Sequence, residues 1–143
     1  MSWPTGTPLL ADKSAWTRAH RCAAAWTTAL SEDRIVICEI VRLELLFSGR
    51  SAADVQALDR NLGTRRDLAI TRGTLISARR AMLDLAERGS DGYHRVPPTD
   101  AIIAACAAEH GCAVLHYDAH YDRLAEVLDF PSVWLAPRGT ADA

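Results

Sequence analysis

Short apolar runs alternate with segments of helical periodicity along this chain. Five runs have the length and composition of buried strands, and they span residues 8–11, 35–38, 68–71, 112–117 and 132–136. Between them, apolar positions recur at helical spacing over residues 13–30 (interrupted near 20), 39–47, 51–62, 74–88, 100–110 and 121–128. This alternation predicts an α/β fold with a parallel sheet. No repeat, low-complexity tract or linker divides the chain, so we expect one domain over residues 1–143, with a tail that frays from about residue 137.

The stretch 96–122 carries an acidic residue near each end of its predicted elements. The double proline at 97–98 closes a loop, and Thr99 is the expected N-cap of the helix that follows. Asp100 then falls in the first turn, where the helix dipole favours an anion. Asp118 arrives as the next strand ends, and Asp122 follows four residues later. Surface solubility alone is a poor reason for this placement.

The helix predicted at 39–47 carries a further carboxylate. Ile40, Leu43 and Phe47 recur at helical spacing and predict an apolar stripe. Glu44 lies one position past Leu43, which places it towards the edge of that stripe.

Composition is that of an ordinary globular protein. Among 143 residues, 49% are hydrophobic and the net charge is −2, which argues against tight non-specific binding to nucleic acid but leaves room for a local basic surface. The four cysteines form no C-x-x-C pair, so we expect buried free thiols in a reducing compartment. The chain shows no signal-peptide pattern and no apolar segment long enough to cross a bilayer. We therefore expect a cytoplasmic protein.

Four carboxylates are predicted to meet at one edge of the sheet. Asp12 and Asp118 both follow predicted strands, and functional groups of open α/β sheets gather beyond the carboxyl ends of the strands. Asp100 opens the helix before the strand that ends at Asp118, and Glu44 needs only a helix that leans over the same edge. Such a cluster is unfavourable unless a cation compensates it, and hard oxygen ligands suit Mg²⁺ or Mn²⁺. These ions activate water and stabilise phosphodiester transition states.

Other chemistries find less support. His116 and His120 are four residues apart, but His116 lies in a predicted strand, so zinc binding by this pair is weakly indicated against ordinary polar positions. Ser14 lacks an evident base partner, so a helix-start role or a contact to the acidic site is favoured over a nucleophile. The usual glycine-rich nucleotide-binding loops are absent from the sequence. An aspartyl phosphotransferase would need a second aspartate two residues after Asp12, where Ser14 stands.

At these residues the sequence resembles the PIN-domain ribonucleases, and among them the VapC-like toxins of bacterial toxin–antitoxin pairs. The matching pieces are L-L-A-D-K-S-A-W, V-R-L-E-L-L-F-S-G, P-T-D-A-I-I-A-A and V-L-H-Y-D-A-H-Y-D. By this resemblance Asp12, Glu44, Asp100 and Asp118 form the family's acidic quartet, and Asp122 matches an additional carboxylate often found near it. Two neighbours of Asp12 would support the site: Ser14 stands where the family has a small hydroxyl residue, and Lys13 departs from the common threonine and could neutralise the pocket or touch a phosphate.

The resemblance also implies an architecture and partners. It implies a parallel sheet of four to five strands between helices, a homodimer, and a cognate VapB-like antitoxin whose C-terminal segment crosses the helices at 39–47 and 51–62. Four apolar residues are candidates for that contact or for ordinary core: Leu45, Leu46, Phe47 and Leu58.

Our leading interpretation is a Mg²⁺-dependent endoribonuclease, with Mn²⁺ as a possible substitute, that acts as a toxin on RNA such as tRNA or rRNA. Asp12, Asp100, Asp118 and Asp122 are the expected metal ligands, with Glu44 positioning the metal or the attacking water. Arg42 and Arg50 are candidate contacts to RNA phosphates. Two rivals remain, namely a structure-specific processing nuclease without an antitoxin and a catalytically silent PIN-like interaction protein.

Overall fold

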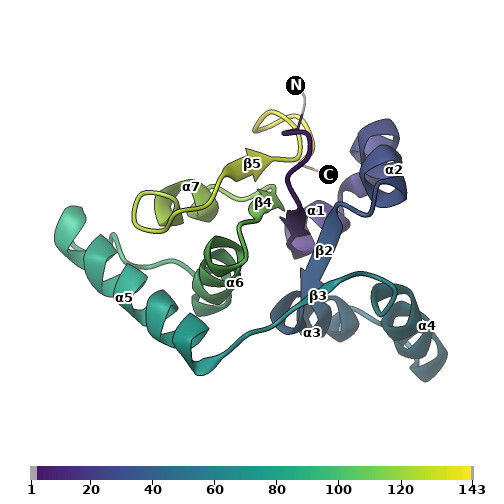
Figure 1. Ribbon diagram of the computed structural model, residues 1–143, viewed down its shortest axis with the longest axis horizontal. Coiled ribbons are helices and arrows are strands. Elements are labelled where there is room, and N and C mark those ends of the chain that lie inside the picture. Colours follow the sequence, from purple (N-terminus) through teal and green to yellow (C-terminus); the bar gives the residue numbers. More distant parts are fainter. Residues whose placement is uncertain (1–2, 143) are drawn as a thin grey trace.

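A parallel sheet of five short strands runs through residues 3–142, the part of the chain that the computed structural model describes. Its strand order is β3-β2-β1-β4-β5, and each neighbouring pair is parallel (Figure 1). The strands are β1 (Leu9–Ala11), β2 (Ile35–Cys38), β3 (Asp67–Leu68), β4 (Ala113–His116) and β5 (Ser132–Trp134). The predicted α/β class with a parallel sheet of four to five strands is confirmed, and β2 has the predicted bounds.

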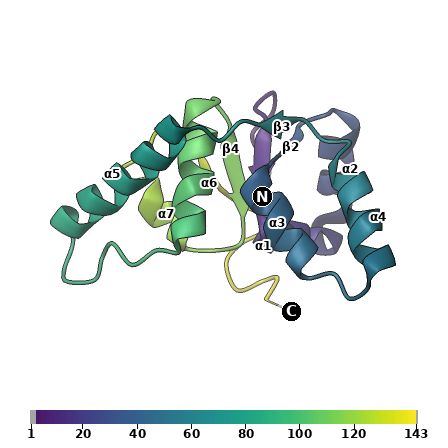
Figure 2. The same cartoon turned by 90° about the horizontal axis from the view of Figure 1, so that it is seen from below.

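Helices connect the strands and cover both faces of the sheet. They are α1 (Lys13–Trp16), the 3-10 turn η1 (Ala19–Cys22), α2 (Ala23–Ser31), α3 (Glu39–Phe47), α4 (Ala52–Leu62), α5 (Arg72–Arg88), α6 (Pro98–Glu109) and α7 (His120–Leu124). In Figure 2, α5, α6 and α7 gather at one end of the sheet and α2 and α4 at the other.

Alternate residues of the central strands serve two separate cores. Leu10 and Val114 pack into a cluster with the apolar residues of α3, α4, α5, α6 and α7. Leu9 and Leu115 point the other way, into a cluster with α1, η1 and α2. Because successive side chains of a strand alternate between its faces, a continuous apolar run marks a strand that is buried on both sides. The molecule is therefore an α/β/α sandwich, as the resemblance implied.

Helix α6 begins two residues earlier than predicted. Pro98 occupies its first position and Pro97 the capping position, where no side chain provides a cap, so the expectation that Thr99 is the N-cap is wrong. Proline suits the first position of a helix because its backbone angle is preset and its missing N–H would have no helical partner there. Asp100 lies in the first turn as predicted.

Helix α3 presents two of the three residues of its predicted apolar stripe to solvent, while Ile40 packs against the core. Val41 and Leu45 face the core, whereas Leu43 is 56% exposed and Phe47 is 87% exposed. The helix carries a second apolar stripe, formed by Val41 and Leu45, and this second stripe is the buried one. Glu44 lies between the two stripes in helical projection, with Ile40 on one side and Val41 on the other, at the edge of the predicted apolar stripe and beside the buried face.

The C-terminal tail is docked on the domain over residues 137–142. Ala141 is only 1% exposed, its backbone N–H donates to the Tyr117 hydroxyl (2.9 Å), and its carbonyl accepts from Nε of Arg18 (2.9 Å). Within the tail that the sequence predicts to fray, Ala141 is thus held by long-range hydrogen bonds that the sequence does not reveal.

Two further sequence expectations can be checked here. None of the helices within residues 3–142 combines the length and the apolar composition needed to cross a membrane. All four cysteines are free, and three of them, Cys38, Cys106 and Cys112, are buried.

The orientation of α3 predicts opposite outcomes for two neighbouring leucines. Leu45→Ala should lower the free energy of unfolding by about 2–4 kcal/mol, because it removes buried methyl groups and leaves a cavity. Leu43→Ala, the matched control on the exposed face, should change it by less than about 0.5 kcal/mol. Urea denaturation of the isolated protein measures both, and a larger loss for Leu43→Ala would reverse the assigned face.

Candidate metal centre

The four predicted carboxylates line one cleft of about 330 Å³ at the carboxyl edge of the sheet. Asp12 follows β1, Asp118 follows β4, Asp100 comes from the first turn of α6 and Glu44 from α3. These four side chains share the cleft with Lys13, Ser14, Thr17, Arg18, Pro97 and Thr99. The structure thus brings the predicted quartet together.

Asp12 is held in place by backbone and hydroxyl donors. It caps α1, and its Oδ1 accepts from the backbone N–H of Ala15 (3.2 Å) and from the hydroxyl of Ser14 (2.5 Å). The same Ser14 oxygen accepts from the backbone N–H of Tyr117 (2.8 Å). Ser14 therefore ties the end of β1 to the end of β4, which fixes the separation of the two aspartate-bearing loops. This is a supporting contact of the kind expected for Ser14.

Asp100 is buried against an aromatic hydroxyl. Its carboxylate is 7% exposed, and its Oδ1 accepts a hydrogen bond from the hydroxyl of Tyr121 (3.2 Å). The Tyr121 hydroxyl also interacts with Asp12, and its ring is fully buried. One phenol thus bridges two carboxylates that would otherwise repel each other. In the sequence, a tyrosine at the start of a helical stretch carries no signal of this role.

Asp118 lies against a histidine. Its Oδ1 accepts from the backbone N–H of His120 (3.0 Å), and Nδ1 of the His120 ring is 2.8 Å from Oδ1 of Asp118 and 3.5 Å from Oδ2 of Asp100. That nitrogen is buried but has no partner in hydrogen-bonding geometry. A nitrogen lone pair so close to carboxylate oxygens is unfavourable unless a proton or a cation lies between them. Asp100, Asp118 and His120 offer ligand atoms that lie within 4.8 Å of one another.

The structure thus places the His120 ring beside two of the predicted carboxylates, whereas its sequence position favoured an ordinary polar residue. His116 is indeed in a strand, and its ring does not join His120: its Nδ1 accepts from the backbone N–H of Asp118 (3.1 Å), and its Nε2 bonds to Ser132 (2.7 Å). Spacing along the chain correctly separated the two histidines but gave no hint that His120 would turn back towards Asp100.

Burial and mutual repulsion hold protons on the cluster. Burial raises the pKa of Asp12 to about 6, although hydrogen bonds from Ser14 and Tyr121 oppose the shift. Burial, followed by the charges of Asp12 and Asp118, raises the pKa of Asp100 to about 7. The pKa of Glu44 is also raised by burial, and the charge of Lys13 partly offsets this. A group of carboxylates with this charge imbalance and an unpartnered imidazole nitrogen fits a divalent cation.

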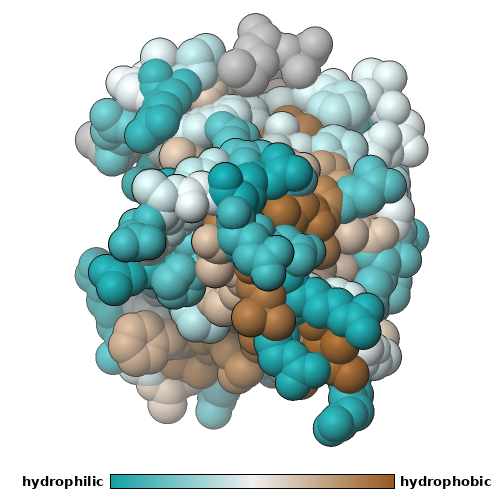
Figure 3. Space-filling model, turned by 90° about the vertical axis from the view of Figure 1, so that its left-hand side faces the viewer, coloured by the Kyte–Doolittle hydropathy of each residue, from teal (hydrophilic) through white to brown (hydrophobic). Residues whose placement is uncertain are grey.

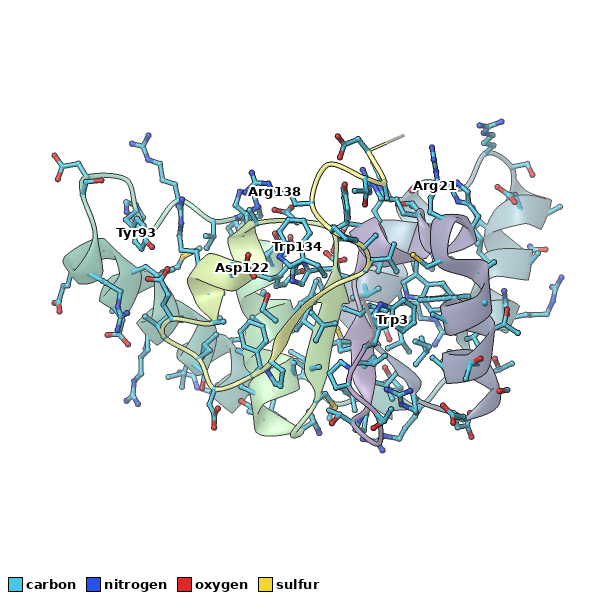
Figure 4. The ribbon with its side chains drawn as sticks, turned by 90° about the horizontal axis from the view of Figure 1, so that it is seen from above. Trp3, Arg21, Tyr93, Asp122, Trp134 and Arg138 are labelled. Carbon is cyan, nitrogen blue, oxygen red and sulfur yellow. The ribbon has the colours of Figure 1, made fainter. Side chains whose placement is uncertain are left out.

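Asp122 lies apart from this cleft. Its Oδ1 accepts from the hydroxyl of Ser132 (2.7 Å) and its Oδ2 from Nε1 of Trp134 (3.0 Å), so both oxygens are engaged by β5 (Figure 4). It does not line the cleft with the other four carboxylates. The structure thus places Asp122 where it anchors the edge strand to α7.

The two arginines expected at the rim also lie elsewhere. Arg42 forms an ion pair with Asp59 (2.8 Å) that ties α3 to α4, and neither Arg42 nor Arg50 lines the cleft. Arg18 and Lys13 line it instead. Lys13 was a sequence candidate, whereas Arg18 was missed because it belongs to the irregular segment between α1 and η1.

Residues 9–127 match the family described as the PIN domain. This chain belongs to the PIN-domain family. It is 40% identical over 131 residues to "Ribonuclease VapC18" of Mycobacterium tuberculosis, an alignment that covers 90% of this chain and 96% of that protein. It is also 37% identical over 140 residues to "Ribonuclease VapC21" of the same species, covering 94% of this chain and 99% of that protein.

Solved structures agree with the PIN fold. "Crystal structure of DNA bound VapBC from Salmonella typhimurium" matches with a TM-score of 0.67 at 18% identity, covering 91% of this chain and 99% of that chain. "Crystal Structure of FitAcB from Neisseria gonorrhoeae" matches with a TM-score of 0.58 at 17% identity, covering 85% and 96%. The PIN-family resemblance inferred from the four sequence motifs is confirmed.

The raised carboxylate pKa values predict an unusual pH dependence of stability in metal-free protein. Between pH 4 and 7 Asp12 and Asp100 bind more protons in the folded state than in the unfolded state, where aspartates titrate near 3.8, so these two groups lower the free energy of unfolding as pH rises through this window. His116, whose pKa burial lowers from 6.5 to about 4, opposes this trend over part of the window, and the two aspartates together outweigh it. Asp100→Asn should be more stable than the wild type by about 1–3 kcal/mol at pH 8, with the difference vanishing near pH 4.

Urea denaturation in EDTA at several pH values measures this difference. The exposed Asp84→Asn on α5 is the matched control and should follow the wild type. A wild type that gains stability from pH 5 to 8 in parallel with Asp100→Asn would contradict the proposed burial of charge.

Proposed function

We propose that this protein is a divalent-metal-dependent endoribonuclease that serves as the toxin of a toxin–antitoxin pair. The observation that carries the proposal is the convergence of Asp12, Asp100 and Asp118, with raised pKa values for the first two, beside the cations Lys13 and Arg18 in a PIN domain. Relatives named as VapC ribonucleases, similar over nine-tenths of the chain, support an RNA substrate. An RNA substrate and free thiols also favour the cytoplasm.

Asp100, Asp118 and His120 would hold the metal ion, with Asp12 beside them. When bound, Mg²⁺ or Mn²⁺ would polarise a phosphate oxygen and lower the pKa of a bound water. The imidazole adds a softer donor than a carboxylate, which Mn²⁺ accepts more readily than Mg²⁺. The hydroxyl of Tyr121 interacts with the carboxylates of both Asp100 and Asp12 and would hold them at a fixed separation.

The remaining cleft residues are placed to handle the substrate. Glu44 is half-buried in the cleft and burial raises its pKa, which makes its carboxylate a stronger base towards an attacking water. Lys13 and Arg18 line the same cleft with positive charges and would contact the phosphates of the RNA. Asp122 would act indirectly, by fixing α7 against β5.

Two apolar surfaces fit the proposed partners. The exposed stripe of Leu43 and Phe47 on α3 is a candidate surface for a VapB-like antitoxin, whereas Leu45, one of the residues considered from the sequence, belongs to the core. A second patch lies at α5 and α6, on the side of the molecule seen in Figure 3, where an apolar groove of about 180 Å³ is lined by residues including Leu75, Met82 and Ile102. We assign this groove to the homodimer contact.

The catalytic proposal predicts loss of RNA cleavage when the cluster is neutralised. Asp100→Asn and Asp118→Asn should each lower the cleavage rate at least 100-fold, because they remove ligands from the metal centre. EDTA should abolish cleavage, and Mg²⁺ or Mn²⁺ should restore it. The assay uses purified antitoxin-free protein, with cleavage products sequenced, and Asp84→Asn as the control that retains activity. Undiminished cleavage by both variants would sink the assignment.

The partner proposal predicts that inhibition and catalysis can be separated. Phe47→Ser should weaken antitoxin binding about tenfold or more while leaving RNA cleavage unchanged, because the side chain is 87% exposed and lies outside the cleft. Leu83→Ser, which changes an exposed apolar residue of α5, is the matched control. Co-purification and titration of cleavage with the antitoxin measure the effect. Equal inhibition of both variants would exclude this stripe as the antitoxin surface.

A further inference from the structure

A second hollow adjoins the acidic cleft. It has a volume of about 500 Å³ and shares Arg18 and Asp118 with the cleft. Its other lining residues include Tyr117, Trp134 and Arg138. An aromatic and cationic surface therefore continues directly from the carboxylate that ends β4.

Trp134 provides a rigid aromatic surface in this hollow. Its indole Nε1 donates to Oδ2 of Asp122 (3.0 Å), and its ring is half-buried. His116 and Tyr117 pack edgewise against it, with ring centroids at 5.1 and 5.5 Å and interplanar angles of 63° and 81°. These contacts fix the orientation of the ring, so that a planar ligand would meet a preformed surface and little entropy would be lost on binding.

Two arginines accompany the aromatic rings. The guanidinium of Arg138 lies 5.8 Å from the centre of the Trp134 ring (Figure 4). The guanidinium of Arg18 lies 5.1 Å from the centre of the Tyr117 ring. Within residues 3–142, neither guanidinium forms an ion pair with a carboxylate. Arg18 donates to the carbonyls of Ala141 and Ser14, which are neutral acceptors, so its charge and that of Arg138 can still attract an anionic ligand, although the carboxylates of Asp118 and Asp142 line the same hollow.

We infer that this hollow is a nucleotide subsite, in which a base next to the scissile phosphate stacks on Trp134 while Arg138 and Arg18 bind the flanking phosphates. Aromatic surfaces paired with arginines are the means by which proteins bind unpaired nucleotides, since every base has a face that can stack. A base inside a duplex has no free face, so the subsite selects single-stranded RNA. The inference rests on the proposed ribonuclease function and adds to it a base-stacking subsite at Trp134.

The subsite predicts specific losses of RNA binding. In an Asp100→Asn background, which prevents cleavage, Trp134→Ala should weaken binding of a single-stranded 12-nucleotide RNA by about tenfold or more, whereas Trp134→Phe should retain most of the affinity. Arg138→Ala changes only an exposed side chain, so its fold is secure; it should weaken binding several-fold and reduce the salt dependence by about one counterion. Arg80→Ala, an exposed arginine of α5, is the matched control.

Tryptophan fluorescence gives a readout that a merely structural role would not change. RNA should quench the fluorescence of the Asp100→Asn protein, and the quenching should largely disappear in Trp134→Phe although that variant still binds. The same RNA annealed into a duplex should bind more weakly and without dependence on Trp134. Fluorescence anisotropy of labelled RNA measures the affinities.

The outcomes separate this inference from the function on which it rests. Wild-type cleavage together with unchanged RNA binding by Trp134→Ala and Arg138→Ala would overturn the subsite alone. Equal dependence of duplex binding on Trp134 would also overturn it. RNA binding that depends on both residues, in a protein that cleaves no RNA with any divalent metal, would support the subsite and reject the ribonuclease.

Discussion

Repulsion among buried carboxylates is the constraint on which the rest of this structure depends. Asp12 and Asp100 are both buried, and without a cation their pKa values rise to about 6 and 7 because the folded protein resists holding both charges. The fold counters the repulsion with hydrogen bonds from Ser14, Tyr121 and the start of α1. These donors orient the carboxylates but do not neutralise them. The carboxylates therefore keep an excess of negative charge, which a divalent cation would neutralise better than the side chains of the cleft do.

The parallel sheet explains why the charges meet at all. β1 and β4 are adjacent, with Ala11 paired to Leu115, and the backbone N–H of Asp12 donates to the carbonyl of Leu115 (3.1 Å). Their carboxyl ends therefore stop at the same level, and the residues that follow them are brought together by register alone. Apolar side chains cover both faces of these strands, so the ends are the only places where polar groups of β1 and β4 can reach a ligand.

Features with local causes were predictable from the sequence. The run 35–38 gave a strand with the right bounds because it is buried on both faces, and Ser51 caps α4 because its hydroxyl needs only the backbone N–H of Asp54, three residues away. The meeting of Asp12, Asp100 and Asp118 was predictable for the same reason, since strand ends and a helix start are local signals, whereas Glu44 depends on how α3 packs over the edge of the sheet. What failed depended on distant neighbours: the buried face of α3 is chosen by the sheet.

The role of His120 likewise depends on residues far along the chain. Its ring lies close to Asp100, which comes from another helix. Asp122 accepts hydrogen bonds from Ser132 and Trp134 of the edge strand. Arg42 forms an ion pair with Asp59 of α4. In each case the residue type was noticed, but its partner could be known only once the elements were assembled. A site residue can thus be nominated from the sequence, whereas the assignment of its partner requires the fold.

The network beyond Asp122 shows how the edge strand reaches the metal centre. The backbone N–H of Asp118 can only donate, so Nδ1 of His116 must accept and Nε2 must carry the proton that it gives to Ser132. The hydroxyl of Ser132 then donates its own proton to Oδ1 of Asp122, which accepts it. Burial lowers the pKa of His116 to about 4, so the neutral ring that this arrangement requires persists at neutral pH. The donor and the acceptor of each hydrogen bond in this chain are thereby fixed. Because Asp122 also holds Trp134, one carboxylate outside the cleft sets both the turn that presents Asp118 and the aromatic surface beside it.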